Sequence, residues 1–73
     1  MKPILYTQRS CGMCRTIHIM LDRSNIDYEE VEVSPENIGS IMESTGISTT
    51  PTLLVDGQML VGAEIAKWIK TRQ

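Results

Sequence analysis

The chain has 73 residues, of which nine are acidic and seven basic, giving a net charge of −2; 41% of its residues are hydrophobic. This size predicts one domain, residues 1–73, around a small hydrophobic core. The basic residues are scattered, so nucleic-acid binding is not expected. No apolar stretch approaches the ~20 residues that a membrane span needs, and the first residues turn polar too early for a signal peptide. We therefore expect a cytoplasmic monomer that does not bind membranes.

The first half of the chain predicts a strand, a helix and a second strand. Residues 4–6 favour a short buried strand, and Ser10 can cap the helix that follows. The apolar stripe of this helix contains Cys14, Ile17 and Leu21. Asn25 can end the helix in the left-handed conformation, and residues 28–33 alternate as a half-buried strand does. A connection of this length is typical of a right-handed parallel crossover.

The second half of the chain predicts a helix, a hairpin and a final helix. Ser34 and Pro35 are typical of a helix start, and Gly46 is typical of a helix end. Two apolar segments flank Asp56-Gly57, a dipeptide that favours a tight β-hairpin. The final helix should face the sheet with Ile65, Trp68 and Ile69. The order βαβαββα predicts an α/β fold.

The only two cysteines, Cys11 and Cys14, form a C-x-x-C motif between the first strand and the first helix. A thiol at the start of a helix lies near unpaired backbone N–H groups and the positive end of the helix dipole. This position, with the positive charges of Arg9 and Arg15, is expected to lower the pKa of the Cys11 thiol below that of a free cysteine. Cys14 is predicted to be the resolving thiol, which attacks a mixed disulfide formed on Cys11.

Metal binding is the main alternative for the same two thiols. A zinc site normally takes four ligands, and the single histidine, His18, lies one helical turn past Cys14. A closed zinc site within one chain is therefore not expected, and no metal ligand is assigned. A copper(I) site on two thiolates stays an alternative, as in a small copper chaperone of the ferredoxin-like fold (βαββαβ), and so does an iron–sulfur cluster bridging two chains.

Thr50-Pro51 precedes the first strand of the predicted hairpin. Proline cannot donate a hydrogen bond within a sheet, so Pro51 marks a strand start. Taken alone, it predicts an ordinary trans bond, since cis bonds form ~5% of X–Pro bonds. A cis bond would leave the backbone of Thr50 available to an extended substrate. The acidic residues Glu29, Glu30 and Glu32 are predicted to form a solvated strand face.

Together these motifs resemble the thioredoxin superfamily, and within it the glutaredoxin family. The resemblance covers essentially the whole chain and rests on residues 6–14, residues 49–53, Asp56-Gly57 and Val61-Gly62. It implies the thioredoxin fold, a mixed four-stranded sheet with the first and third helices on one face and the second helix on the other. It also implies disulfide exchange with Cys11 as the nucleophile, a cis Pro51 facing it, and binding of substrate backbone by Thr50.

The resemblance further implies glutathione as a candidate co-substrate and no bound cofactor. Glutaredoxins hold glutathione with a basic residue before the first cysteine, here Arg9, and with a glycine-rich turn after the last strand. Ala63 departs from that turn at its second glycine, and Gly12-Met13 departs from the usual dipeptide. The implied substrate-binding residues are Arg9, Met13, Thr50, Pro51, Gly62 and Ala63. The predicted function is a dithiol–disulfide oxidoreductase, an electron donor that reduces protein or glutathione mixed disulfides and is recycled by glutathione or by thioredoxin reductase.

Overall fold

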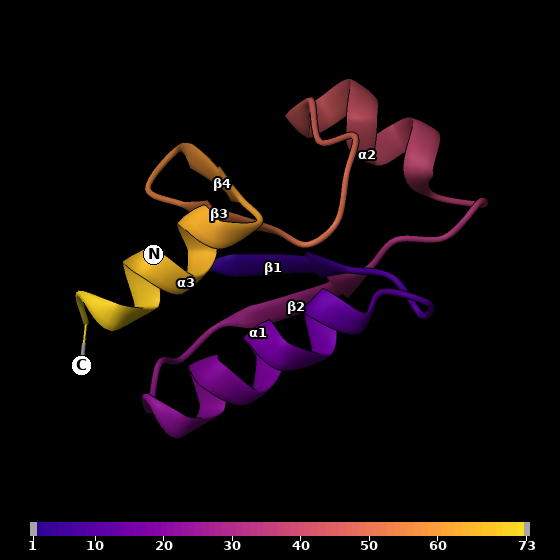
Figure 1. Ribbon diagram of the computed structural model, residues 1–73. Coiled ribbons are helices and arrows are strands. Elements are labelled where there is room, and N and C mark those ends of the chain that lie inside the picture. The colour runs from indigo at the N-terminus through magenta and orange to yellow at the C-terminus, as the bar shows by residue number, and fades with distance from the viewer. Residues whose placement is uncertain (1, 73) are drawn as a thin grey trace.

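The computed structural model describes residues 2–72 of the chain and follows the predicted order βαβαββα (Figure 1). The strands are β1 (Ile4–Thr7), β2 (Glu29–Glu32), β3 (Thr52–Val55) and β4 (Gln58–Val61). The helices are α1 (Gly12–Arg23), α2 (Ile38–Thr45) and α3 (Ala63–Lys70).

The described strands form one mixed sheet in the order β2-β1-β3-β4. β1 and β2 are parallel, with Ile4 opposite Glu29 and Thr7 opposite Glu32. β3 runs antiparallel to both β1 and β4. The β1–α1–β2 connection is thus the parallel crossover that the sequence predicts. Because parallel strands end at the same edge of a sheet, the carboxyl ends of β1 and β2 lie side by side, close to where the chain enters α1.

Each face of the sheet carries its own hydrophobic core, because successive side chains of a strand point to opposite faces. The core beneath α1 and α3 contains Leu5, Ile17, Leu21, Leu53, Val55, Ile65 and Ile69. The core beneath α2 contains Tyr6, Val33 and Ile47, with Ile38 and Ile41 packed against them. The predicted arrangement, with two helices on one face and one on the other, is confirmed. Trp68 is half-buried at the edge of the first core, and the guanidinium of Arg72 lies 4.7 Å from the centre of its ring.

The second helix begins later than the sequence predicts. Ser34 and Pro35 are expected as its cap and first turn, but α2 begins at Ile38. The side chain of Asn37 accepts the backbone N–H of Ser34 at 2.7 Å and donates to the carbonyl of Glu32 at 3.0 Å. These two bonds hold the segment after β2 in a turn, so the helix starts only after Asn37.

Left-handed backbone conformations lie where the sequence predicts them. Gly46 ends α2 with φ 78°, and Asn25 follows α1 with φ 55°. Asp56 and Gly57 join β3 to β4 with φ values of 48° and 81°. Two successive positive φ values match the twist of the flanking strands, which is why this dipeptide makes a tight hairpin.

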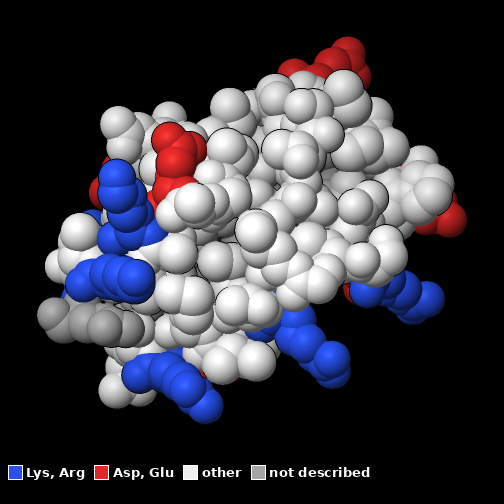
Figure 2. Space-filling model, in the orientation of Figure 1, with Lys and Arg blue, Asp and Glu red and all other residues white. Residues whose placement is uncertain are grey.

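The surface carries its charges in small groups. On the face shown in Figure 2, most atoms belong to uncharged residues, and the Lys and Arg side chains lie along the rim, apart from one another. Within residues 2–72, no helix combines the length and the apolar content needed to cross a membrane.

Candidate active site

Cys11 and Cys14 are joined as a disulfide at the start of α1, with their Cα atoms 5.3 Å apart. Cys11, and not Ser10 as the sequence predicts, is the N-cap of α1, because its sulfur accepts the backbone N–H of Cys14 at 3.1 Å. Cys11 is half-buried, whereas Cys14 is only 3% exposed and shares the buried stripe of α1. Solvent and an incoming substrate can therefore reach Cys11 more readily than Cys14.

The disulfide lies at an open hollow of about 280 Å³. Its walls come from the end of β1, the loop before α1, the first turns of α1 and the exposed side of β2. The lining residues are Thr7, Gln8, Arg9, Cys11, Cys14, Arg15, His18, Glu30 and Glu32. The parallel register explains this composition, because it places Glu32 opposite Thr7, at the end of β1 from which the chain leaves toward Cys11.

The charges around this hollow are mixed in sign. The Nε atom of Arg9 lies 3.2 Å from the Oε1 atom of Glu32, and both side chains are exposed. Glu30 accepts a hydrogen bond of 3.2 Å from the hydroxyl of Thr7. Arg15 makes no ion pair with any residue between 2 and 72. Of the two arginines that line the hollow, Arg9 is thus paired within the protein and Arg15 is not.

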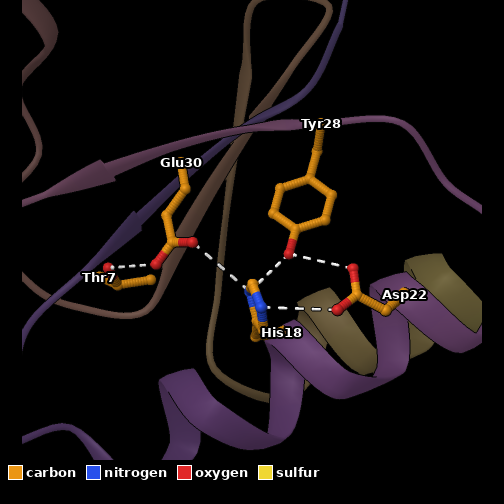
Figure 3. A network of polar contacts seen from close by, with 5 residues as sticks. All are labelled: Thr7, His18, Asp22, Tyr28 and Glu30. Atoms are coloured by element: carbon orange, nitrogen blue, oxygen red, sulfur yellow. Dashed lines mark hydrogen bonds and ion pairs between the residues drawn. The ribbon is translucent and has the colours of Figure 1, made fainter.

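His18 is the centre of a polar network that joins α1 to β2 (Figure 3). Its Nδ1 atom lies 2.5 Å from the hydroxyl of Tyr28 and 3.5 Å from Oε1 of Glu30. Its Nε2 atom lies 3.4 Å from Oδ2 of Asp22, which also accepts a hydrogen bond from Tyr28 through its other oxygen. Burial, followed by the carboxylates of Asp22 and Glu30, raises the pKa of Tyr28 to about 12. The hydroxyl of Tyr28 therefore keeps its proton at neutral pH.

The Thr50–Pro51 peptide bond is cis, as the resemblance implies, and the trans bond expected from the dipeptide alone is wrong. Pro51 is buried, and the hydroxyl of Thr50 donates a 3.1 Å hydrogen bond to the side-chain oxygen of Gln8. Thr52, next in the chain, is buried and donates to the carbonyl of Thr49. The loop before β3 is thereby tied to the loop that leads to Cys11.

Three of the residues predicted to bind substrate lie away from this hollow. Met13 is 53% exposed in the first turn of α1. Gly62, with φ 55°, is the N-cap of α3, and Ala63 is the first residue of that helix. The carboxylate of Glu64 accepts the backbone N–H of the residue before Gly62, Val61, at 3.1 Å. The structure thus brings Arg9 together with the two cysteines and leaves Met13, Gly62 and Ala63 outside the walls of the hollow.

Several residues at the site were not found by reasoning from the sequence. The interpretation of Glu30 and Glu32 as part of a solvated strand face is incomplete, because both line the hollow beside the cysteines. Tyr28 and Thr7 were likewise not assigned to the site. The predicted parallel crossover contains the missing signal: when β2 lies parallel to β1, its last side chains lie beside the end of β1 and therefore beside the C-x-x-C motif.

The fold excludes the ferredoxin-like alternative. That fold ends on a strand, whereas here an antiparallel β3–β4 hairpin is followed by α3, which packs on the sheet. Within residues 2–72, no three His, Cys, Asp or Glu side chains are grouped so as to hold a metal ion. Copper(I) on the two thiolates and a cluster bridging two chains stay untested predictions.

A C-x-x-C disulfide at the start of the first helix, after the first strand of a mixed four-stranded sheet, defines a class of protein that exchanges thiols and disulfides. The family model for glutaredoxin matches residues 4–60, and the chain belongs to the glutaredoxin family. It is a thiol–disulfide oxidoreductase whose active site is the Cys11–Cys14 motif.

Known proteins and structures agree with this assignment. Glutaredoxin 1 of Rickettsia prowazekii is 37% identical over 65 residues, which cover 84% of this chain and 68% of that protein. Glutaredoxin 1 of Rickettsia typhi is 35% identical over 65 residues, which cover 84% of this chain and 62% of that protein. The chain thus spans about two thirds of the length of these relatives.

Solved structures support the fold over nearly the whole chain. The crystal structure of the thioredoxin-like protein BC3987 is 27% identical, with a TM-score of 0.78, and the match covers 99% of this chain and 100% of that one. The solution structure of glutaredoxin from Brucella melitensis is 21% identical, with a TM-score of 0.68, and the match covers 96% of this chain and 78% of that one. The second match supports the fold alone.

Proposed function

We propose that the chain reduces disulfides in proteins, and mixed disulfides between proteins and glutathione, with Cys11 as the nucleophile and Cys14 as the resolving thiol. The observation that carries this proposal is the unequal exposure of the two joined cysteines. Cys11 is half-buried at the start of α1, and Cys14 is 3% exposed behind it. An incoming disulfide can reach Cys11 first, which gives each cysteine its own step.

In the first step the thiolate of Cys11 attacks one sulfur of the substrate disulfide. A bond forms between Cys11 and that sulfur, the substrate S–S bond breaks, and the other substrate thiolate leaves and takes a proton from water. The backbone N–H of Cys14, which points at the sulfur of Cys11, and the N-terminus of α1 both stabilise negative charge on that sulfur.

In the second step Cys14 loses its proton to water and attacks the sulfur of Cys11. The Cys11–Cys14 disulfide forms, and the second substrate thiolate leaves. Two electrons have then passed from the protein dithiol to the substrate. Two thiols of an external reductant such as glutathione, or a reductase, must return two electrons before the next cycle.

Two electron donors are supported by different observations. Membership of the glutaredoxin family supports glutathione, and Arg9 at the hollow supplies a cation near Cys11. The match to a thioredoxin-like protein along the full length of both chains supports thioredoxin reductase as the second candidate. Ala63, which stands where glutaredoxins have a glycine, favours the same alternative.

The test is a pair of NADPH-coupled assays with bis(2-hydroxyethyl) disulfide as the common substrate. One assay contains glutathione and glutathione reductase, and the other contains thioredoxin reductase. We expect NADPH oxidation with glutathione, and its loss in Cys11→Ser. Oxidation only with thioredoxin reductase would assign the second donor. An active Cys11→Ser variant, or no activity in either assay, would overturn the proposed cycle.

The residues proposed to contact substrate are Arg9, Met13, Thr50, Pro51, Gly62 and Ala63. Contacts within the protein support Thr50 most directly, because its hydroxyl binds Gln8 in the loop that leads to Cys11. A small hollow of about 40 Å³ between these loops is lined by both residues. An extended substrate that reaches Cys11 would pass next to this position.

A further inference from the structure

The Arg9–Glu32 ion pair stands between two hollows next to the redox-active disulfide. Both residues line the hollow that contains Cys11 and Cys14. Both also line a second hollow of about 430 Å³, which extends toward the start of the turn before α2. The pair joins the loop before Cys11 to the last residue of β2, so a ligand in either hollow meets both charges.

The other charges around the first hollow do not substitute for Arg9. Glu30 is held by the hydroxyl of Thr7 and by His18, so its carboxylate is fixed in place. Arg15, on α1, makes no ion pair within residues 2–72. The cation closest in sequence to the nucleophilic cysteine is therefore the one that a carboxylate of the protein already occupies.

We propose that Glu32 determines the charge preference of the active site by occupying Arg9, so that neutral and basic disulfide partners react faster than anionic ones such as glutathione mixed disulfides. This inference rests on the proposed disulfide reductase function. An anionic ligand that binds Arg9 must displace Glu32 and then lie beside its negative charge. A basic ligand meets two carboxylates, Glu30 and Glu32, on the exposed side of β2.

The ion pair is solvent-exposed, with side-chain exposures of 92% for Arg9 and 55% for Glu32. Such a pair adds little to stability, because water screens it and ordering two long side chains is unfavourable. Its effect on a ligand is therefore an effect of charge at short range, and added salt should weaken it. Like charges near a binding site change partner choice and association rate more than they change stability.

The experiment measures how fast the pre-reduced protein reacts once with three probes. Each probe is the same uncharged cysteine peptide in a disulfide with glutathione (anionic), 2-mercaptoethanol (neutral) or cysteamine (cationic). Acid quenching and mass spectrometry follow formation of the Cys11–Cys14 disulfide, so no reductase affects the rate. Glu32→Gln is compared with Glu29→Gln, which removes the same charge from the other end of the same strand, outside both hollows.

In Glu32→Gln we expect the anionic probe to react about three to ten times faster, and the cationic probe slower by a similar factor. The neutral probe should change less than about twofold, and the difference between probes should shrink at roughly 0.5 M salt. Glu29→Gln should leave all three rates within about twofold of wild type, because screening limits the reach of a surface charge to about 10 Å.

Arg9→Gln adds an independent check. It should slow the anionic probe more in the Glu32→Gln background than in the wild-type background, because only there is the guanidinium unoccupied. Equal effects in both backgrounds would overturn the inference.

The remaining outcomes separate the inference from the function on which it rests. If wild type reduces the neutral probe but Glu32→Gln shifts all three rates alike, Glu32 does not select by charge. If Glu29→Gln shifts the rates as much as Glu32→Gln does, net charge alone explains the effect. If wild type reduces none of the probes, the proposed function fails and the inference fails with it.

Discussion

The stability of the oxidised protein should fall between pH 10 and pH 12 because of one side chain, Tyr28. Burial, followed by the carboxylates of Asp22 and Glu30, raises the pKa of Tyr28 from 10.0 to about 12. Below pH 10 the phenol is protonated in both the folded and the unfolded chain, so it adds no pH dependence there. Between pH 10 and about 12 it ionises only in the unfolded chain, and this favours unfolding.

The size of this loss follows from the difference between the two pKa values. A folded-state pKa two units above the ordinary one corresponds to at most ~2.7 kcal/mol. Tyr28 is only partly buried, and solvent screens its interaction with the two carboxylates, so we expect roughly 1 kcal/mol. Tyr28→Phe keeps the ring and removes the ionisable group. It also loses the contacts with His18 and Asp22, which is a constant loss of about 1 kcal/mol at neutral pH.

The assay is urea unfolding of oxidised wild type and Tyr28→Phe at several pH values from 8 to 12, followed by the fluorescence of Trp68. Other groups titrate in the same range, but they are common to both proteins and cancel in the difference. The difference in unfolding free energy should be constant up to about pH 10 and then shrink by roughly 1 kcal/mol toward pH 12. A difference that stays constant up to pH 12 would refute the reasoning.

Three further predictions concern the cysteines and the backbone. Cys14→Ser should stop at the mixed disulfide with a protein substrate, visible as an added mass on Cys11, and added glutathione should release it; the absence of a trapped species would argue against Cys14 as the resolving thiol. In the reduced protein, iodoacetamide should modify Cys11 at least about ten times faster than Cys14, because the latter is 3% exposed; peptide mapping measures both rates, and equal rates would contradict the assigned order. Gly46→Ala should lower the unfolding free energy by about 1 kcal/mol, because φ is 78° there and no neighbouring atom would contact the added methyl group; unchanged urea unfolding would contradict a purely conformational cost.

How much the sequence can predict depends on how local the deciding interactions are. The hairpin at Asp56-Gly57 and the end of α2 at Gly46 follow from residues that tolerate positive φ, so local chemistry is sufficient. The start of α2 was misplaced because two adjacent cap candidates compete. Asn37 bonds the backbone on both sides of Ser34, and which side chain makes those bonds is not decided by cap preference alone.

The contents of the active-site hollow depend on interactions between distant residues. Thr7 and Glu30, which form one of its hydrogen bonds, are 23 positions apart. Their contact requires both the parallel pairing of β1 with β2 and the register of that pairing. A shift of one residue would exchange the two faces of β2, so the alternation of residues 28–33 alone could not assign Glu30 and Glu32 to the cysteines.

The same register separates two properties of the site along the chain. The redox-active pair depends on β1, the loop after it and the first turn of α1, where Cys11 caps the helix and Cys14 is buried. The charge beside the pair comes from β2, which contributes no sulfur and no helix end. Substitutions on the exposed side of β2 can therefore change which disulfides react quickly while the thiol chemistry stays the same, because the exposed glutamates contribute little to either hydrophobic core.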